Sequence, residues 1–323
     1  MKKIVDDIRL IYKVCSLYYE DDMNQKQIGE YLGVSRSSVV RMLQKGKQQG
    51  IVQIQLHNPA SYNYGELEKK LETKYGMKDV VIVENSVLDT KSEAVSQLFG
   101  KAAEFLADFF KEGDCVGVSM GHTLNNVVQT NRSFVRKENL MFVPMVGGIS
   151  RSTVDGIDVQ SNAIARQFSE KFGGTYTQFL SPAVFSDKTV MEYFLQEKAV
   201  NFIFDEFRKI NVMVVGIGIP ERADHTLIKA GYAQKDELDR LSEAGAVGDI
   251  CLKFFDKDGN TENFCSFNDR VAAMAFRMMK KVPNRIGIAS GEKKVTAVKG
   301  AIRGGLINIL ITNAEMAEKL VGE

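Results

Sequence analysis

The chain has 323 residues, of which 44% are hydrophobic and 26% charged, and its formal net charge is +1. This size and apolar content argue against a disordered chain and allow a full hydrophobic core, divided between a small and a large domain. The N-terminus carries Asp6, Asp7 and Arg9 where a signal peptide needs an unbroken apolar core, and no later apolar run is long enough to span a membrane. We therefore expect a cytoplasmic protein.

The cysteines and histidines argue against a metal centre. The four cysteines lack the clustered spacing of a zinc site, and the chain has only three histidines. We therefore predict no metal site and no cofactor. Structural or buried thiols in a reducing compartment are expected at Cys15, Cys115, Cys251 and Cys265.

The first predicted helix has an apolar face that can cover the elements after it. That face consists of Ile4, Ile8, Ile11, Cys15 and Tyr18. The segment from Asn24 to Leu56 then predicts two short helices, a tight turn between them and a strand after them. Ile28 and Leu32 share one face of the first of these helices, and Gly33 supplies the backbone freedom of a sharp turn. This is the outline of a winged helix-turn-helix module.

The second helix of the module has a buried stripe and a polar face. Ser35 is its predicted N-cap, and Gly50 ends it. The buried stripe consists of Val39, Met42 and Leu43. Val52, Ile54 and Leu56 alternate with glutamines, as a half-buried strand does, and this strand would form the wing.

The polar face of the second helix is the predicted DNA contact. Its candidate residues are Ser35, Arg36, Ser37, Ser38 and Arg41. From Val34 to Ala60 the chain carries four basic residues and no Asp or Glu, although the whole chain is nearly neutral. Locally concentrated positive charge favours a polyanionic partner. The alternative is an ordinary helical hairpin whose basic residues are only solvated.

A linker is predicted at His57 to Pro59, where the pattern breaks. The predicted domains are 1–57, which binds DNA, and 58–323, which binds the effector and oligomerises. Helical spacing resumes from Tyr64 to Tyr75 and ends at Gly76. This helix can couple the domains or pair with itself in a dimer.

Short apolar strands then alternate with helices. The predicted strands are Val80–Val83, Cys115–Ser119, Leu140–Val146, Val212–Ile217, Ile286–Ala289 and Ile307–Thr312. The predicted helices are Glu93–Phe110, Leu124–Thr130, Val159–Phe172, Lys188–Lys209, Lys293–Arg303 and Ala314–Leu320. This alternation predicts an α/β fold with a largely parallel sheet and helices on both faces.

Glycine-bearing turns follow several of these strands. They are SMGHT from Ser119 to Thr123, the pair Gly147 and Gly148, the pair Gly216 and Gly218, and ASGEKK from Ala289 to Lys294. In open parallel sheets ligands bind beyond the carboxyl ends of the strands, and backbone N–H groups at a helix start can cradle an anion. A single turn of this kind is as often plain loop geometry as a site. The spacing matches neither a dinucleotide fingerprint nor a P-loop.

Several stretches in series resemble the motifs of the SorC family of sugar-responsive transcriptional regulators. They are VGVSMGHTL from Val116, FVPMVGGIS from Phe142, QSNAIA from Gln160, VVGIGIP from Val214, GAVGDI from Gly245, ASGEKKVTAV from Ala289 and LINILITN from Leu306. The resemblance spans nearly the whole chain and includes the helix-turn-helix. It implies a three-layer α/β/α effector domain, related in fold to sugar-phosphate isomerases and deaminases, that binds a phosphorylated sugar.

The resemblance also assigns site residues. It places the phosphate on the loop of Gly121, His122 and Thr123 and on Lys294, and the sugar hydroxyls near Gln160, Asn162 and Asp249. With the residues of the glycine turns, the predicted effector site is Ser119, Gly121, His122, Thr123, Gly147, Gly148, Gln160, Asn162, Asp249 and Lys294. Alternatively, Lys294 is a solvated helix residue, Asp249 caps a turn, and His122 is a neutral donor, a phosphate partner or a general base.

Three positions depart from the family pattern. His122 stands where the family carries a small or basic residue, and Ser290 replaces the first glycine of the usual AGG. Val146 stands where some members carry a cation. Because valine forms neither an imine nor an ion pair, covalent capture of an aldehyde at this position is excluded and the sugar stays open.

The function predicted from these observations is a regulator, repressor or activator, and not an enzyme. Its expected partners are operator DNA, a phosphorylated sugar and further copies of the chain in a dimer or tetramer, since one small module makes few phosphate contacts. An isomerase or deaminase-like enzyme is the first alternative, although no carboxylate and histidine pair stands beside the anion loops. A factor that contacts RNA polymerase is the second.

Overall fold

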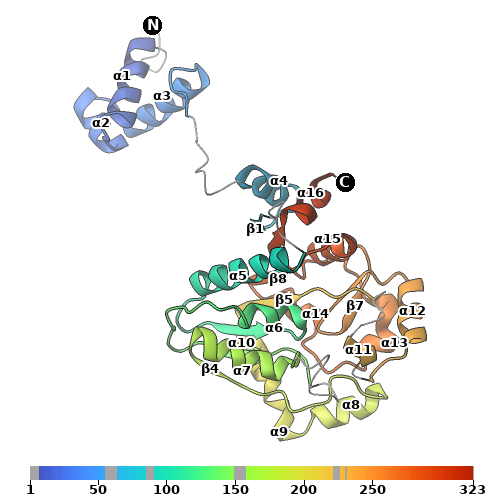
Figure 1. Cartoon of the computed structure of the whole chain (residues 1–323). Coiled ribbons are helices and arrows are strands. Elements are labelled where there is room, and N and C mark those ends of the chain that lie inside the picture. Colours follow the sequence, from blue (N-terminus) through green and yellow to red (C-terminus); the bar gives the residue numbers. More distant parts are fainter. Residues whose placement is uncertain are drawn as a thin grey trace. The chain divides into compact units, whose positions relative to one another are not determined.

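The computed structural model describes residues 7–54, 64–84, 91–148, 158–220, 226–229 and 231–322. The chain divides into two compact units, Met1–Asn63 and Tyr64–Glu323. Figure 1 draws both units. The predicted linker at 57–59 and the predicted boundary between residues 57 and 58 lie outside the described residues, so the boundary stays a prediction.

The N-terminal unit is built from α1 (Ile8–Tyr19), α2 (Gln25–Leu32) and α3 (Arg36–Gln48). Its buried core consists of Ile11, Val14, Cys15, Ile28, Val39, Met42 and Leu43, which confirms the predicted stripes of α2 and α3. The predicted face of α1 is wrong at its start, because Ile8 is 63% exposed. Asp7 caps α1 immediately before Ile8, so this residue lies in the first turn, beyond the packed part of the helix. Ile4 lies outside the described residues.

The turn between α2 and α3 has the predicted chemistry. Gly33 ends α2 with a φ of +65°, in the left-handed region that favours glycine. Asn24 and Gln27 form a reciprocal capping box at the start of α2. Gly29 is also required, because a Cβ there would lie 2.8 Å from the carbonyl oxygen of Val34. The close approach of α2 to the turn therefore depends on its lack of a side chain.

The predicted wing strand is not formed in its described part. Ile51 and Val52 lie in a bend, and Gln53 and Ile54 have no regular structure. The Val52 amide donates to the Gly46 carbonyl of α3, and Ile54 is 60% exposed. A strand needs a paired neighbour to satisfy its backbone, and residues 51–54 have none in the described part of this unit. Leu56 lies outside the described residues.

The larger unit contains a seven-stranded sheet in the order β1-β9-β8-β5-β2-β3-β4, with every pairing parallel. Its strands are β1 (Asp79–Val83), β2 (Cys115–Val118), β3 (Met141–Pro144), β4 (Thr175–Tyr176), β5 (Val212–Gly216), β8 (Asn284–Ile288) and β9 (Ile309–Asn313). The predicted parallel sheet is confirmed. The prediction missed β4, which at two residues is too short to show a period.

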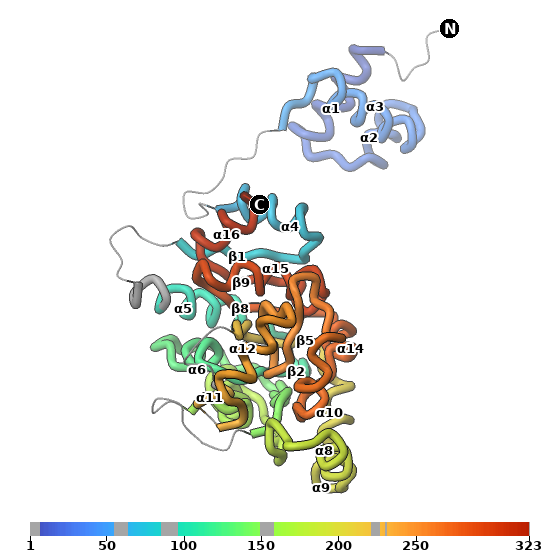
Figure 2. Tube along the Cα trace, turned by 90° about the vertical axis from the view of Figure 1, so that its right-hand side faces the viewer, coloured from blue at the N-terminus to red at the C-terminus, as the bar shows by residue number. Residues whose placement is uncertain are grey.

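Helices cover both faces of the sheet (Figures 1 and 2). One face packs against α5 (Lys91–Phe109), α6 (His122–Val128) and α7 (Ser161–Phe172) through Val116, Val118, Val212 and Val214. The intervening residues, Met213 and Val215, belong to the core on the opposite face. There the helices include α4 (Gly65–Tyr75), α10 (Ile203–Lys209), α12 (Lys235–Glu243), α15 (Val295–Arg303) and α16 (Ala314–Gly322). Apolar residues on both sides are expected of a parallel sheet covered on both faces.

Two other features differ from the sequence prediction. The helix predicted at Lys188–Lys209 is three helices, α8 (Lys188–Leu195), α9 (Lys198–Asn201) and α10. An antiparallel hairpin of β6 (Gly248–Ile250) and β7 (Lys253–Phe255) was not predicted, because three-residue strands carry too little pattern. The remaining short elements are α11 (Thr226–Lys229), α13 (Cys265–Asn268), α14 (Phe276–Met279), and the 3-10 turns η2 (Glu262–Phe264) and η3 (Glu292–Lys294).

The thiols follow the prediction at three of four positions. Cys15, Cys115 and Cys251 are buried, whereas Cys265 is exposed. Burial raises the pKa of the Cys115 thiol to about 11, so that it stays protonated near neutral pH. Among the described residues no cluster of His, Cys, Asp or Glu has the arrangement of a metal site. None of the described helices is long and apolar enough to cross a membrane.

Candidate functional site

Helix α3 presents the predicted DNA-contacting residues on its outer face. Arg36, Ser37 and Arg41 are exposed and Ser38 is half-buried. The Ser35 hydroxyl caps the helix by accepting from the Ser38 amide at 3.2 Å. Ser35 is thus engaged at the helix start, and the exposed side chains beyond it are the ones that can reach a groove.

Neighbouring groups orient the two arginines of α3. The Arg36 Nε donates to the Gln25 side chain of α2 at 3.4 Å, and the Arg41 Nε donates to the Ser37 carbonyl at 3.3 Å. Both bonds use Nε rather than the terminal nitrogens. Because guanidinium groups read guanine edges and phosphates through paired N–H donors, this arrangement is compatible with DNA contact.

In the larger unit, the loop after β2 is hydrogen-bonded to the end of β5. The Ser119 hydroxyl accepts from the Gly216 amide at 3.2 Å, and only 1% of Ser119 is exposed. Thr123 also faces Gly216, where a Cβ would lie 3.2 Å from the Cβ of Thr123. Helix α6 begins at His122, two residues before the predicted start, and Gly121 precedes it with a φ of +115°.

The Gly121 amide is already used, because it donates to the Val159 carbonyl at 2.9 Å. The predicted anion cradle of the β2 loop is therefore reduced by one backbone donor. The bond also fixes the start of α7 beside the loop, since Gln160 is the N-cap of that helix. His122 and Thr123 are half-buried at the first turn of α6.

The glycine pair after β3 allows close packing. A Cβ on Gly147 would lie 2.5 Å from the Pro182 carbonyl oxygen, and one on Gly148 would lie 3.0 Å from the Gln160 Oε1. The Gly148 carbonyl accepts from the Ala183 amide at 2.6 Å and from the Tyr232 hydroxyl at 3.1 Å. Tyr232 was not predicted, because no sequence pattern links it to Gly148.

Asn162 has a structural partner. Its Oδ1 accepts from the Phe179 amide at 2.8 Å, and its Nδ2 donates to the Phe179 carbonyl at 3.2 Å. This paired contact holds the segment around Phe179 against α7. The side chain lies beside Gly148, since its Nδ2 would be 3.9 Å from a Cβ there.

Lys294 and Asp249 meet the residues that follow β5. The Lys294 ammonium donates to the Ile217 carbonyl at 2.6 Å. Asp249 and Gly218 exchange two backbone hydrogen bonds of 3.0 and 3.2 Å, and a Cβ on Gly218 would lie 1.9 Å from the Asp249 carboxylate. The same carboxylate accepts from the Leu252 amide, which is the turn-capping contact considered as an alternative.

The predicted effector residues therefore converge at the carboxyl ends of the central strands of the sheet. Ser119 and Thr123 contact Gly216, Lys294 contacts Ile217, and Asp249 contacts Gly218. The loops that carry the remaining predicted residues are linked to each other through the Gly121–Val159 bond and the contact of Gly148 with Gln160 and Asn162. Strands β8, β5, β2 and β3 are adjacent and parallel, so their carboxyl ends lie together.

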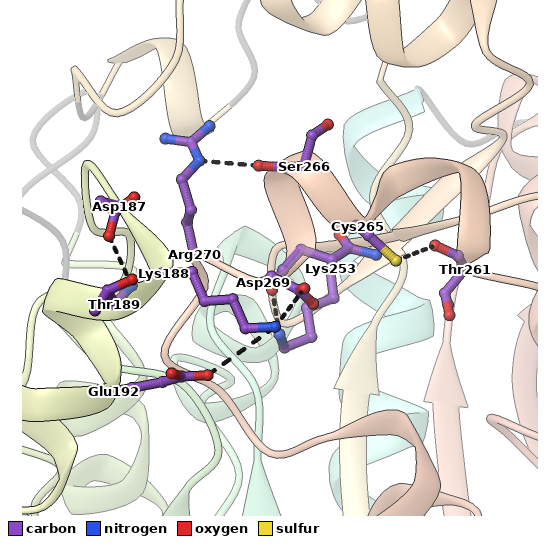
Figure 3. Close-up of polar contacts among 11 residues, drawn as sticks. Asp187, Lys188, Thr189, Glu192, Lys253, Thr261, Cys265, Ser266, Asp269 and Arg270 are labelled. Carbon is purple, nitrogen blue, oxygen red and sulfur yellow. Dashed lines mark hydrogen bonds and ion pairs between the residues drawn. The ribbon is translucent and has the colours of Figure 1, made fainter.

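A second polar cluster brings Lys188, Lys253 of β7 and Asp269 together (Figure 3). Lys188 pairs with Asp269 at 3.0 Å and lies 4.0 Å from Glu192. The Lys253 ammonium of β7 donates to the Asn268 carbonyl at 2.5 Å. Burial lowers the pKa of Lys253 to about 8, and the carboxylate of Asp269 opposes this shift. The bond from Lys253 attaches β7 to Asn268, and β7 pairs with β6, the strand that carries Asp249.

Comparison with known proteins identifies the family. Residues 62–322 match the sugar-binding domain family. The chain is 31% identical to the sorbitol operon regulator of Klebsiella pneumoniae over 322 residues, which is 98% of each chain. This chain belongs to the SorC family of transcriptional regulators. It is also 31% identical to the deoxyribonucleoside regulator of Bacillus subtilis over 317 residues, which is 98% of each chain.

The fold of this SorC-family chain agrees with a solved structure over both units. The full-length sorbitol operon regulator from Klebsiella pneumoniae matches with a TM-score of 0.71 and 30% identity, over 98% of this chain and 99% of that one. The relatives named here are transcriptional regulators, which supports a regulator and not an isomerase or deaminase. The family resemblance in the sequence is confirmed.

Proposed function

We propose that this SorC-family regulator changes its affinity for operator DNA when a phosphorylated sugar binds at the carboxyl edge of its sheet. The observation that carries the proposal is the meeting of Thr123, Lys294 and Asp249 on three consecutive residues, 216–218. A lysine suits a phosphate dianion, and a carboxylate suits sugar hydroxyls. Each charge-assisted hydrogen bond to the phosphate contributes roughly 1.5–3 kcal/mol.

The class of ligand is supported by the relatives. One is named for a sorbitol operon and the other for deoxyribonucleosides, and both names refer to polyhydroxylated carbon chains or rings. The Gln160 side chain lies beside Gly148 and the Asp249 carboxylate beside Gly218, and together they offer both donors and acceptors to such hydroxyls. Phosphorylation is inferred from Lys294 and from the glycines that permit close approach.

The DNA-binding part of the proposal assigns Arg36, Ser37, Ser38 and Arg41 to the operator, with Ser35 fixing the start of the helix. One module offers few positive charges, so we infer that the regulator acts as a dimer or tetramer on repeated half-sites. The effector then acts through its different affinities for the two states of the assembly.

A thermal-shift screen of the full-length chain tests the ligand. Hexitol, hexose and pentose phosphates are compared with their unphosphorylated counterparts and with inorganic phosphate. A ligand at one hundred times its dissociation constant stabilises the chain by about 2.7 kcal/mol. Stabilisation by a phosphate ester, but not by its parent sugar, is the expected result. Stabilisation by the parent sugar alone would contradict the assigned phosphate group.

Substitution of Lys294 tests the site. Lys294→Ala should abolish the response to the stabilising phosphate and leave operator binding nearly intact. Lys293→Ala is the matched control, because Lys293 is the exposed neighbour in the same turn η3. A Lys294→Ala variant that keeps the full ligand response, or that loses operator binding without ligand, would remove Lys294 from this role.

A further inference from the structure

Helix α4 is the first element of the larger unit, directly after the connection from the DNA-binding unit, and it is fixed to the edge of the sheet. The Glu68 carboxylate accepts from the Ile82 amide of β1 at 2.8 Å, and the Glu72 carboxylate accepts from the Val80 amide at 3.3 Å. These amides lie on the outer side of an edge strand, where no further strand of the described residues pairs. Glu68 is only 3% exposed. Two side-chain hydrogen bonds therefore attach α4 to β1.

The other end of α4 holds the C-terminal helix α16. The Lys74 ammonium donates to the Leu320 and Val321 carbonyls at 3.1 Å, and the Tyr75 hydroxyl donates to the Leu320 carbonyl at 2.8 Å. Carbonyls in the last turn of a helix lack partners within it and carry partial negative charge, so a lysine there stabilises the helix end. In Figures 1 and 2, α4 and α16 lie side by side.

Helix α16 also contacts η3, the turn that carries Lys294. Lys319 forms an ion pair with Glu292, the first residue of η3 and two residues before Lys294. The hydrogen bond from Lys319 lowers the pKa of the Glu292 carboxyl, so this group is ionised near neutral pH. Lys319 lies next to Leu320, whose carbonyl binds both Lys74 and Tyr75. The turn of Lys294 is therefore connected to α4 through α16, by the Glu292–Lys319 ion pair at one end and the bonds to the Leu320 carbonyl at the other.

We propose that the Glu292–Lys319 pair is a positioning contact that couples the effector turn η3 to α16, and through α16 to α4 and the connection to the DNA-binding unit. The inference rests on the proposed function, because it requires a ligand at Lys294. Binding of a phosphate there changes the position of η3, and the pair transfers this change to the helix whose end is held by Lys74 and Tyr75.

The exposure of the pair makes the proposal testable. Lys319 and Glu292 side chains are 37% and 67% exposed. Exposed ion pairs add little to folding stability, so loss of this one should leave the fold intact. A change in the coupling between ligand and DNA then reports the contact itself and not general destabilisation.

The experiment uses the full-length chain and an operator duplex selected by that chain from random DNA. The probe is whichever of sorbitol 6-phosphate, 2-deoxyribose 5-phosphate, fructose 6-phosphate and inorganic phosphate changes the wild-type operator affinity most. The measured quantity is the ratio of operator dissociation constants with and without this probe, with the dissociation constant of the probe measured by calorimetry. Lys319→Met and Glu292→Gln should each bring the ratio closer to one by about two- to fivefold.

Two controls separate coupling from packing. Lys319→Arg keeps the charge and should retain the ratio. Arg240→Met removes an exposed ion pair with Asp236, 2.9 Å long and on α12, and should leave the ratio unchanged. The double variant Glu292→Gln with Lys319→Met should lose no more than either single variant, because both remove the same contact.

Each remaining outcome contradicts either the coupling role of the ion pair or the proposed function. A Lys319→Met ratio equal to wild type, or a Lys319→Arg loss as large as that of Lys319→Met, overturns the coupling role and leaves the proposed function standing. Loss of operator affinity without probe in Lys319→Met assigns a purely structural role and also overturns it. A wild-type chain that responds to none of the probes overturns the proposed function, and the coupling falls with it.

Discussion

Arg36 is the residue whose loss tests recognition most directly, because it projects from the start of α3 while its guanidinium is held by Gln25. Arg36→Ala should weaken specific operator binding by about 1–3 kcal/mol if the arginine reads a guanine through paired hydrogen bonds. Arg36→Lys keeps the charge but not the planar fork, so it should restore non-specific binding more than specific binding. Affinities for the operator and for a scrambled duplex check this. Unchanged operator affinity in both variants would remove Arg36 from recognition.

Lys253 makes stability depend on pH in a defined window. Its pKa is about 8 in the folded chain and 10.5 for an ordinary lysine. Between these values the unfolded chain binds more protons than the folded chain, so the free energy of unfolding rises with pH. The rise from this one group is at most about 1.4 kcal/mol for each pH unit.

Urea unfolding at pH 7.5 and 9.5 measures this effect. We expect the wild-type chain to gain more stability between the two values than Lys253→Met does, because methionine carries no proton. Titration of other groups is common to both chains and cancels in the difference. An equal change in both chains would show that Lys253 is not held with a lowered pKa.

At the scale of elements, the contact between α1 and α3 depends on one glycine. A Cβ on Gly46 would lie 2.4 Å from the Cys15 Sγ, inside the core of the N-terminal unit. Gly46→Ala adds about 1 kcal/mol of helix propensity, but overpacking of a core costs about 1–3 kcal/mol. We expect the overpacking to dominate and the melting temperature of the N-terminal unit to fall.

A compensating substitution identifies the cause. Cys15→Ala removes the sulfur atom, so the double variant Gly46→Ala with Cys15→Ala should be more stable than Gly46→Ala alone. Thermal unfolding followed by circular dichroism compares the variants. If the double variant is the less stable of the two, the clash with Cys15 is not the reason for the loss.

At the scale of the whole molecule, we expect several copies of the chain to assemble on DNA, because one helix α3 offers few positive charges to the phosphates. Helix α3 carries two arginines and two lysines, and Lys47 lies over the Tyr19 ring at 5.9 Å. We expect a dimer or tetramer on a palindromic operator, since symmetric half-sites multiply the phosphate contacts. Sedimentation of the complex, with a single half-site duplex as control, measures the stoichiometry. A strictly monomeric mass on the palindrome contradicts the expectation.

The local pattern of the sequence determined the elements and the type of unit. The stripe of Val39, Met42 and Leu43, the cap at Ser35 and the glycine at residue 33 depend on near neighbours, so their spacing was enough to predict α2, α3 and the turn. The alternation of strands and helices was likewise enough to predict a parallel sheet. Local reasoning was wrong where burial depends on distant partners, as at Ile8 and in the residues after Val52.

The tertiary structure alone decided which residues meet. Asp249 reaches Gly218 through a hairpin too short to be predicted, and Tyr232 reaches the Gly148 carbonyl from a segment without any motif. Motif resemblance proposed Lys294, but only the fold gave it the Ile217 carbonyl as a partner and linked its turn to α16 through Glu292. The physical reason is that these contacts join residues far apart in the chain. The order of the strands in the sheet sets the distances between such residues, and the spacing of residues along the chain does not.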